Sequence, residues 1–463
     1  MSYQRLYCLD VGQGMCTYFE EYDEDHDIVA NALFDLGSTK ARRRAGRPTV
    51  AFLKQQIIAR SDDGNGYVDA IFLSHKDADH INLLRLLLAE LPDMGIGYVF
   101  HSGRYDWYGT KSTPNILTAL GRRTEDAANC ILNFRVGTSS FPTGNQKDWH
   151  AIWSSDNAAA YVIAVNTPLA ATHQGKTVEE AYKTDDPDGD LANSTSLGIY
   201  LGMYKVGAVI FGDATFSTFQ FVNKHFLERS VWLSNTFMLQ APHHGSRSTT
   251  FGLKVSDAIV SEEANEVVKT FASLTYGATI IVSADTSHDH PSLNTIDAFE
   301  AFADKATPWW VDENVAPNHL VSVYFDIPPA TGESPYNKPY TYQTNQNFYT
   351  TLYYGKTTTK GNFSFPPQKA LTAPTAAFAE GMNWGYEIRA DSSVNARNIL
   401  MAGFSSNRLP KSRVQLDAAF LAVQKPLVEA ASTAPPAAPP KPSGAARPAA
   451  HAQRTLRRLV PRR

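Results

Sequence analysis

Ser74-His75-Lys76-Asp77-Ala78-Asp79-His80 directly follows the apolar run Ala70-Ile71-Phe72-Leu73. The apolar run is typical of a buried strand, and the turn after it brings two histidines and two aspartates into one small volume. Neutral imidazole and carboxylate oxygen suit zinc, manganese or iron, and such a set can serve two ions about 3.5 to 4 Å apart. A polar, solvated turn is the alternative, but the complete H-x-D-x-D-H pattern favours a metal site.

The length and charge of the chain limit its class. Its 463 residues exceed the usual size of one compact domain, so we expect a large domain with insertions, or two domains with appendages. The 43% hydrophobic content is ample for a core. The formal net charge of -4 argues against a protein that coats nucleic acid by bulk charge, so any polyanion would be held locally.

Cysteine usage and hydropathy indicate the compartment. Cys8, Cys16 and Cys130 show no C-x-x-C spacing, and their odd number leaves no complete disulfide framework, which predicts a reduced, cytoplasmic environment. The N-terminus lacks a charged stretch followed by an apolar one, and no segment reaches the roughly 20 apolar residues of a membrane span. We therefore expect no membrane segment.

Alternating strand and helix signals predict an α/β fold. Strand patterns bounded by turn residues precede amphipathic helix patterns several times. Such an order requires layers of sheet and helix rather than a helical bundle or a plain sandwich. The expected strands are 6–11, 15–20, 32–37, 70–73, 196–203, 208–211, 236–240 and 277–283, and the expected helices are 49–59, 81–91, 216–227 and 293–302.

Changes in composition divide the chain into three parts. We expect a main domain over 1–307, with an insertion at about 103–189 where the regular pattern weakens, and an accessory β-rich region over 308–428. Residues 429–463 are first Ala/Pro-rich and then basic, a composition that cannot bury enough apolar surface, so we expect a disordered tail. Its basic end could touch nucleic acid or an anionic surface, or be simply solvated.

Further ligand-type residues follow three later strands. They are Asp213, the pair His243-His244, and the group Asp285, His288, Asp289 and His290. In α/β folds, sites are assembled at the edge where the parallel strands end. We therefore expect these residues to converge with the 75–80 cluster.

The order and wording of these motifs resemble the metallo-β-lactamase fold, and within it the soluble domain of ComEC-type competence proteins. The matching motifs are Leu9-Asp10-Val11-Gly12-Gln13-Gly14, Phe34-Asp35-Leu36-Gly37, the 75–80 cluster, Asn193-Ser194-Thr195-Ser196-Leu197, Phe211-Gly212-Asp213, His243-His244-Gly245-Ser246 and the segment from Ser283 to Pro291. The resemblance covers roughly residues 6–302. It implies an αββα sandwich, so that 1–307 would be a metallo-β-lactamase-like catalytic domain.

The resemblance also implies a ligand set. His75 and Asp77 would bind one metal ion, Asp79 and His80 would bind the second, and Asp213 would bridge both. Two divalent ions bridged by a carboxylate activate a shared water and stabilise charge on a phosphoryl or carbonyl oxygen. Asp79 could also orient that water or accept its proton.

Two groups of histidines leave alternatives open. One of His243 and His244 would complete the second metal position while the other faces the substrate, and the sequence does not say which. His290, or in second place His288, would donate a hydrogen bond or a proton to a substrate oxygen. The alternative for this second group is a cap on the following helix, where Asp289 could serve equally.

Two positions depart from the wider superfamily. Asn193 stands where many members place another ligand histidine, so the first ion would be held more weakly or completed by water or substrate. Asp77 also stands where histidine is usual. Both departures move the ligand set towards oxygen, which favours manganese over a pure zinc site, so the expected cofactors are two divalent ions, zinc or manganese.

Five further polar residues are candidates for supporting or substrate contacts. Asp10 and Gln13 would support the ligand loops by hydrogen bonds, or belong to an ordinary glycine-rich turn. Asp35 is either such a support or a turn former. Ser246 and the arginine after it could meet a phosphate, whereas a solvent-exposed arginine is the alternative.

Three functions are compatible with these residues. The resemblance implies a metal-dependent phosphodiesterase or nuclease, and the basic segments 40–44 and 454–463 favour nucleic acid as substrate. The acidic net charge favours instead a small-molecule ester, lactone or cyclic-nucleotide hydrolase, and the fold does not choose between the two. The third is a non-catalytic metal-binding protein whose C-terminal region recruits a partner protein.

Overall fold

The computed structural model describes most of the first 300 residues and short strands beyond them. The described residues are 2–9, 11, 13–39, 46–61, 63–110, 113–135, 150–167, 183, 189–204, 206–226, 233, 236–253, 259–275, 279–283, 292–300, 348–350, 356–357, 363–364, 383–389, 394–399 and 414–416. The predictions for Asp10, His288, His290 and the tail over 429–463 lie outside them.

The first sheet is half antiparallel and half parallel. Among the described residues its strand order is β18-β17-β16-β1-β2-β3-β4-β5-β6. Neighbours from β18 to β3 pair antiparallel, whereas β3, β4, β5 and β6 pair parallel, so the last four end at one edge. The strands are β1 (Tyr3–Cys8), β2 (Thr17–Tyr22), β3 (Ile28–Phe34), β4 (Tyr67–Leu73), β5 (Gly95–His101), β6 (Ile131–Asn133), β16 (Asn383–Arg389), β17 (Val394–Ile399) and β18 (Val414–Leu416).

The second sheet repeats this plan. Its order in the described part of the chain is β13-β12-β11-β10-β9-β8-β7. The pairs from β7 to β10 are antiparallel, and β10, β11, β12 and β13 are parallel. The strands are β7 (Trp153–Ser154), β8 (Ala158–Ala164), β9 (Gly198–Met203), β10 (Val206–Phe211), β11 (Thr236–Gln240), β12 (Thr279–Val282) and β13 (Phe348–Thr350), and a separate small pair joins β14 (Lys356–Thr357) to β15 (Phe363–Ser364).

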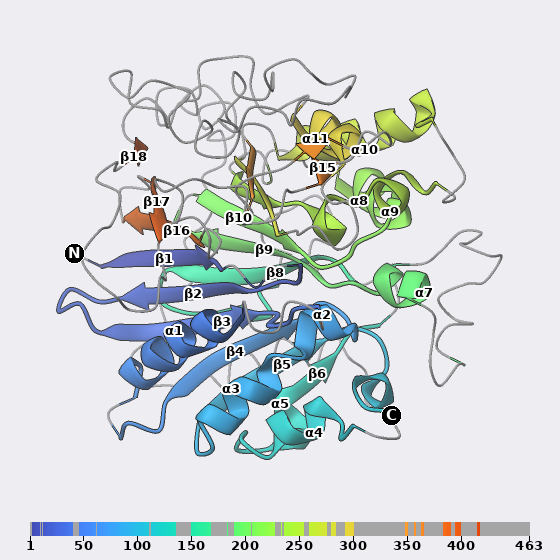
Figure 1. Ribbon diagram of the computed structural model, residues 1–463. Coiled ribbons are helices and arrows are strands. Elements are labelled where there is room, and N and C mark those ends of the chain that lie inside the picture. The colour runs from blue at the N-terminus through green and yellow to red at the C-terminus, as the bar shows by residue number, and fades with distance from the viewer. Residues whose placement is uncertain are drawn as a thin grey trace.

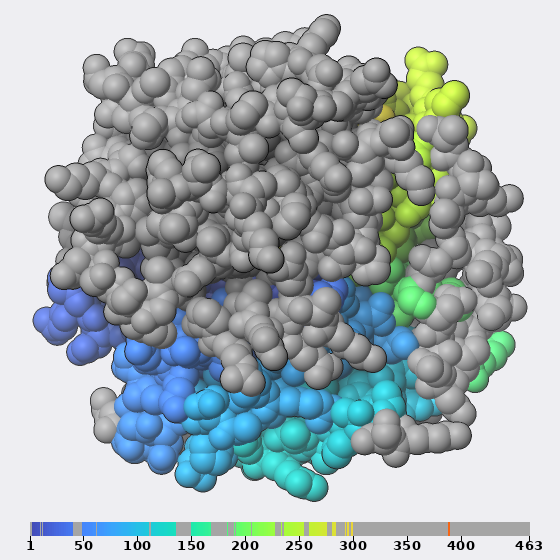
Figure 2. Space-filling view, in the orientation of Figure 1, coloured from blue at the N-terminus to red at the C-terminus, as the bar shows by residue number. Residues whose placement is uncertain are grey.

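Helices cover the outer face of each sheet, which gives four layers (Figure 1). The first sheet is covered by α1 (Gly46–Ala59), α3 (Leu84–Glu90), α4 (Ile116–Gly121) and α5 (Ala127–Cys130), and the second by α8 (Phe216–Phe226), α9 (Arg247–Phe251), α10 (Glu262–Leu274) and α11 (Leu293–Glu300). In the space-filling view the helices of the first sheet form the blue-to-cyan surface at the bottom (Figure 2). The predicted αββα sandwich is confirmed.

The larger hydrophobic core lies between the two sheets. Along β4, Ala70 and Phe72 point into this core, whereas Ile71 and Leu73 point towards the helices, as the two-residue period of a strand requires. Both faces of β4 are therefore buried, which explains why its sequence is an uninterrupted apolar run. The strand is held rigidly up to the residue before the ligand cluster.

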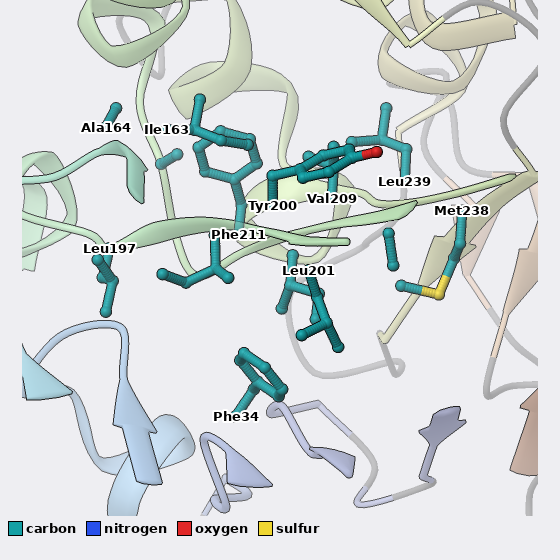
Figure 3. Close-up of a cluster of buried hydrophobic side chains, with 14 of the residues drawn as sticks. Phe34, Ile163, Ala164, Leu197, Tyr200, Leu201, Val209, Phe211, Met238 and Leu239 are labelled. Carbon is teal, nitrogen blue, oxygen red and sulfur yellow. The ribbon is translucent and has the colours of Figure 1, made fainter. Parts of the chain in front are cut away.

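An aromatic ladder underlies the end of this strand. The rings of Phe34 and Phe72 stack with centroids 4.6 Å apart, and those of Phe72 and Phe100 stack at 4.9 Å. These residues pair across β3, β4 and β5, and Phe34 faces Leu201 of the second sheet (Figure 3). Offset aromatic pairs contribute about 0.5 to 1.5 kcal/mol each beyond burial, so the ladder fixes the strand ends that carry the polar residues.

The helix expected over 81–91 is wrong in its start and continuity. A short helix α2 (Ala78–Ile81) begins inside the ligand cluster, and α3 begins only at Leu84. The reason lies in Asn82, whose side-chain oxygen accepts a hydrogen bond from the Ser38 N–H at 3.1 Å and whose amide donates to the Ser38 carbonyl. This exchange joins the break between the helices to the loop after β3.

Strands from the predicted insertion and accessory region belong to the two sheets. In the described part of 103–189, β6 extends the first sheet, while β7 and β8 extend the second. Beyond residue 307, β16 pairs along the whole of β1, and β13 pairs with β12. Ile388 of β16 is fully buried in the inter-sheet core. These strands therefore help to enclose the core that supports the ligand cluster.

Within the described residues, none of the helices combines the length and the apolar character needed to cross a bilayer.

Candidate metal centre

Ligand-type side chains from both sheets meet where β4, β10 and β11 end. His75 follows β4, Asp213 follows β10, and His244 follows β11. Ligand atoms of His75, His80 and Asp213 lie within 4.8 Å of one another, and so do those of Asp79, His80 and His244. The two groups share His80, so the structure places them side by side.

Asp213 lies at the centre of the cluster. Its Oδ1 is 3.0 Å from His80 Nε2 and 3.5 Å from His244 Nε2. Its Oδ2 is 3.7 Å from His75 Nε2 and 3.5 Å from His243 Nε2. Each oxygen of this one carboxylate therefore faces its own pair of imidazoles.

The two aspartates of the 75–80 segment lie on opposite sides of this centre. Asp77 Oδ2 is 3.7 Å from His75 Nε2, and Asp79 Oδ2 is 3.5 Å from His244 Nε2. Their side chains are 28% and 22% exposed, whereas those of His75 and His244 are buried. The cluster thus has a buried floor of imidazoles and a carboxylate rim that solvent can reach.

Four atoms at the centre fit a divalent cation. The Nε2 atoms of His75, His80 and His244 and the Oδ1 of Asp213 are all buried and make no hydrogen bond within the described residues. A buried polar atom without a hydrogen bond costs about 1 to 3 kcal/mol, and four of them converge here. Imidazole nitrogen and carboxylate oxygen are the donors that zinc and manganese accept, so bound divalent metal would satisfy these atoms.

Hydrogen bonds behind the rings set the imidazole tautomers. The Ser74 hydroxyl donates to Asp35 Oδ2 at 2.6 Å, so its oxygen accepts from His75 Nδ1 at 3.0 Å. His80 Nδ1 donates to the same Asp35 oxygen at 2.8 Å, and His244 Nδ1 donates to the Ser283 carbonyl at 2.6 Å. With the proton on Nδ1, each Nε2 presents its lone pair to the centre, which is the form that binds a metal.

Asp35 itself is held in an unusual backbone conformation. Its φ of 51° lies in the left-handed region, and its Oδ1 accepts a hydrogen bond from the Ser74 N–H at 2.7 Å. The sequence left open whether Asp35 supports the ligands or forms a turn. Its side chain contacts His80 and Ser74, the residue before His75. The sequence assigns no role to Ser74 or Ser283, although Ser74 directly follows one predicted strand and Ser283 ends another.

The electrostatics of the cluster are those of a carboxylate among several imidazoles. Burial alone would raise the pKa of Asp213, but His243, His80 and His244 hold the pKa of this carboxyl well below its usual range. Burial would lower the pKa of His80, but Asp213 and Asp35 raise it well above its usual value. Protons on the imidazoles thus supply the positive charge that balances the carboxylates, and metal binding would release these protons.

Two glycines allow the ligand loops to approach closely. A Cβ on Gly37 would overlap the carbonyl group of Asp79, and a Cβ on Gly212 would overlap the side chain of Ser74. The N–H of Leu36, next to Gly37, donates to the His80 carbonyl at 2.8 Å. The loops after β3 and β10 therefore pack directly on the 75–80 segment.

The histidine pair lies on a sharply turned backbone. His243 and His244 have φ values of 48° and 53°, in a 3-10 segment η7 (Pro242–Gly245) that follows β11. Left-handed conformations cost about 1 to 2 kcal/mol for residues with a Cβ, so the surrounding contacts must impose them. The turn directs one ring to each side of Asp213, which sequence alone could not show.

The remaining predicted residues are placed as follows. Asn193, in α7 (Gly189–Ser194), is buried with its Nδ2 3.5 Å from His243 Nδ1. Gln13 is buried, and its backbone carbonyl accepts a hydrogen bond from the Thr39 N–H at 2.8 Å. Ser246 Oγ lies 3.4 Å from the hydroxyls of Ser248 and Thr249 in α9, so it is occupied within its own turn.

Comparison with known proteins gives distant structural likenesses. No family model matches the sequence, and no curated protein matches it. Solved structures that are similar include unliganded yeast PDE1 (10% identity, 65% of this chain and 94% of that one, TM-score 0.37) and the metallo-β-lactamase fold protein YhfI from Bacillus subtilis (12%, 65% and 93%, 0.29). A third is Igni18, a metallo hydrolase from Ignicoccus hospitalis (11%, 60% and 81%, 0.26). These likenesses are too distant to assign an activity.

Proposed function

We propose that this protein is a metal-dependent phosphodiesterase, with DNA or RNA as its substrate. The observation that carries the proposal is that four buried donor atoms, three imidazole nitrogens and one carboxylate oxygen, gather around Asp213 without a hydrogen bond among the described residues. A non-catalytic scaffold has no need for a solvent-reachable rim of carboxylates beside such a point. The basic segments 40–44 and 454–463 support a polyanionic substrate.

The donor set divides into two metal positions that share Asp213. His75, Asp77 and Asp213 Oδ2 would hold the first ion, and Asp79, His80, His244 and Asp213 Oδ1 would hold the second. Divalent ions held by these residues would supply a nucleophilic water and neutralise phosphoryl charge. Zinc and manganese both suit these ligands, and the four carboxylate-type contacts favour manganese.

The protein's own groups supply orientation and proton handling. Asp79, whose side chain is 22% exposed and whose Oδ2 is 3.5 Å from His244 Nε2, would orient the attacking water and accept its proton. Among the described residues, His75, His80 and His244 are buried and Asp77 and Asp79 are partly exposed, so a substrate would approach from the side of the two aspartates. His290, or in second place His288, would protonate the leaving oxygen.

The test combines metal analysis with activity. The purified protein would be analysed for bound metal and assayed on plasmid, single-stranded DNA, RNA and bis-p-nitrophenyl phosphate, beside Asp213→Asn and Asp79→Ala. The matched control is Asp69→Asn. It removes a carboxylate of β4 that is paired with Arg60 and lies outside the ligand cluster. Polynucleotide cleavage that is lost in both site variants and kept in the control is the expected result.

Two other outcomes would decide against the proposal. Turnover confined to small esters or cyclic nucleotides would indicate the small-molecule hydrolase instead. Stoichiometric metal without turnover of any phosphoester would indicate a metal-binding protein that acts through a partner. Either result would leave the ligand geometry intact and reject the nuclease.

A further inference from the structure

The two metal positions of the proposed function differ in how complete they are. The second has His80, His244, Asp79 and one oxygen of Asp213. The first has only His75, Asp77 and the other oxygen of Asp213. Structural sites for zinc have four protein ligands, and catalytic sites have three.

The geometry around Asp213 Oδ2 offers a fourth donor. His243 Nε2 lies 3.5 Å from this oxygen, closer than the 3.7 Å that separates the same oxygen from His75 Nε2. On the other side, His244 Nε2 lies 3.5 Å from Asp213 Oδ1. The two adjacent histidines therefore bear the same relation to the two oxygens of one carboxylate.

We infer that His243 is the fourth ligand of the first metal position and that Asn193 orients its ring. This rests on the metal centre of the proposed function. Beyond the proposed function, His243 would no longer contact the substrate, and the first ion would have two histidines and two carboxylates, as the second ion has.

The position of Asn193 supports this role. Its side-chain amide lies 3.5 Å from His243 Nδ1, and its Oδ1 is buried without a hydrogen bond. Rotation by 180° about the Cβ–Cγ bond exchanges the amide oxygen and nitrogen, and the oxygen then accepts from Nδ1–H. The lone pair of His243 Nε2 is thereby directed to the centre. Asn193 would do for His243 what the Ser283 carbonyl does for His244.

The backbone of the pair is consistent with two ligands rather than one. Both His243 and His244 occupy the left-handed region, and their rings are 6.0 Å apart and nearly perpendicular. The His243 N–H donates to the Gly212 carbonyl at 3.1 Å, which ties this turn to the residue before Asp213. Two strained residues in succession are what is needed to direct neighbouring side chains to opposite sides of one carboxylate.

The experiment measures metal stoichiometry and affinity rather than turnover. Apoprotein would be titrated with Mn²⁺ and separately with Zn²⁺ by calorimetry, with bound metal counted by elemental analysis. The variants are His243→Ala, Asn193→Leu and Asn193→Asp, with His225→Ala, an exposed histidine of α8, as the matched control. Thermal unfolding of each variant would report whether the fold is intact.

The wild type and His225→Ala are expected to bind two ions. His243→Ala should bind one ion with unchanged affinity and lose the other. Asn193→Leu keeps every donor but cannot accept from Nδ1, so its weaker ion should bind about 10- to 100-fold less tightly, whereas Asn193→Asp restores the acceptor and should bind at least as tightly as the wild type.

Retention of both ions at wild-type affinity in His243→Ala would overturn the inference, and His243 would then face the substrate. So would an Asn193→Leu variant that binds both ions like the wild type. A wild type that binds no divalent ion would instead reject the proposed function, so the two failures are distinguishable.

Discussion

Replacing Asp35 by asparagine is expected to weaken metal binding although Asp35 itself is not a ligand. Its carboxylate accepts three hydrogen bonds, from the Ser74 N–H at 2.7 Å, the Ser74 hydroxyl at 2.6 Å and His80 Nδ1 at 2.8 Å. An asparagine can keep the backbone bond through its one oxygen. Its NH2 group then faces His80 Nδ1 and favours the tautomer with the proton on Nε2, which cannot bind a metal.

The magnitude follows from the bond that is lost. A hydrogen bond to a charged group contributes about 1.5 to 3 kcal/mol. At about 1.4 kcal/mol for each tenfold change, this corresponds to roughly a 10- to 100-fold loss in affinity for the ion bound by His80. The loss should be largest for the ion bound by His80, and it should extend to His75, because the Ser74 hydroxyl that accepts from His75 Nδ1 also loses its acceptor on Asp35.

The assay is calorimetric titration of apoprotein with Zn²⁺ or Mn²⁺ at neutral pH. Asp69→Asn is the matched control, since Asp69 also accepts a backbone N–H, that of Asn31 at 2.8 Å, but lies outside the ligand cluster. Long-range nitrogen NMR of the His80 ring would report the tautomer directly. Equal affinities in the two variants, with His80 still protonated on Nδ1, would refute the reasoning.

Three further substitutions test the packing and the buried charges. Gly37→Ala would force a Cβ into the Asp79 carbonyl and should lower the free energy of unfolding by about 1 to 3 kcal/mol. The control is Gly202→Ala, whose Cβ meets nothing closer than 3.4 Å and which should cost less. Urea unfolding of the two variants measures the difference. Burial raises the pKa of Glu20 to about 7. Its contribution to the free energy of unfolding is therefore complete below about pH 4.5 and is lost as the pH rises to 7, a fall of about 3 kcal/mol. Glu20→Gln should flatten this fall when unfolding is measured between about pH 5 and 8. Asn166→Ala would remove a side chain that accepts from the Gly103 N–H at 2.9 Å and donates to the Phe134 carbonyl at 2.8 Å, and it would leave alanine at a φ of 50°. A loss of about 2 to 5 kcal/mol in the free energy of unfolding is expected.

The structural role of Asn166 could not be predicted from the sequence. It lies in the segment predicted as an insertion, yet its backbone N–H donates to the Thr195 carbonyl at 3.1 Å, and its side chain joins the ends of β5 and β6. The contacts that give it this position come from residues 29 to 63 places away in the chain. No local pattern around Asn166 predicts them.

The sequence by itself determined the strand ends and the chemistry they carry. The apolar run before His75, and the polar residues that follow strands at Asp213 and His244, are local patterns, and a strand's burial and its end are written in residues next to one another. Because parallel strands end at a common edge, the convergence of these residues also followed from the order of elements.

The tertiary structure decided which atom faces which. The division of His243 and His244 between the two oxygens of Asp213, and the contact of Asn193 with His243, depend on left-handed backbone angles and on packing across two sheets. The pairing of β16 with β1 likewise joins residues nearly 400 positions apart. Such contacts arise from shape and hydrogen bonding between distant segments, and these have no counterpart in the period or composition of either segment alone.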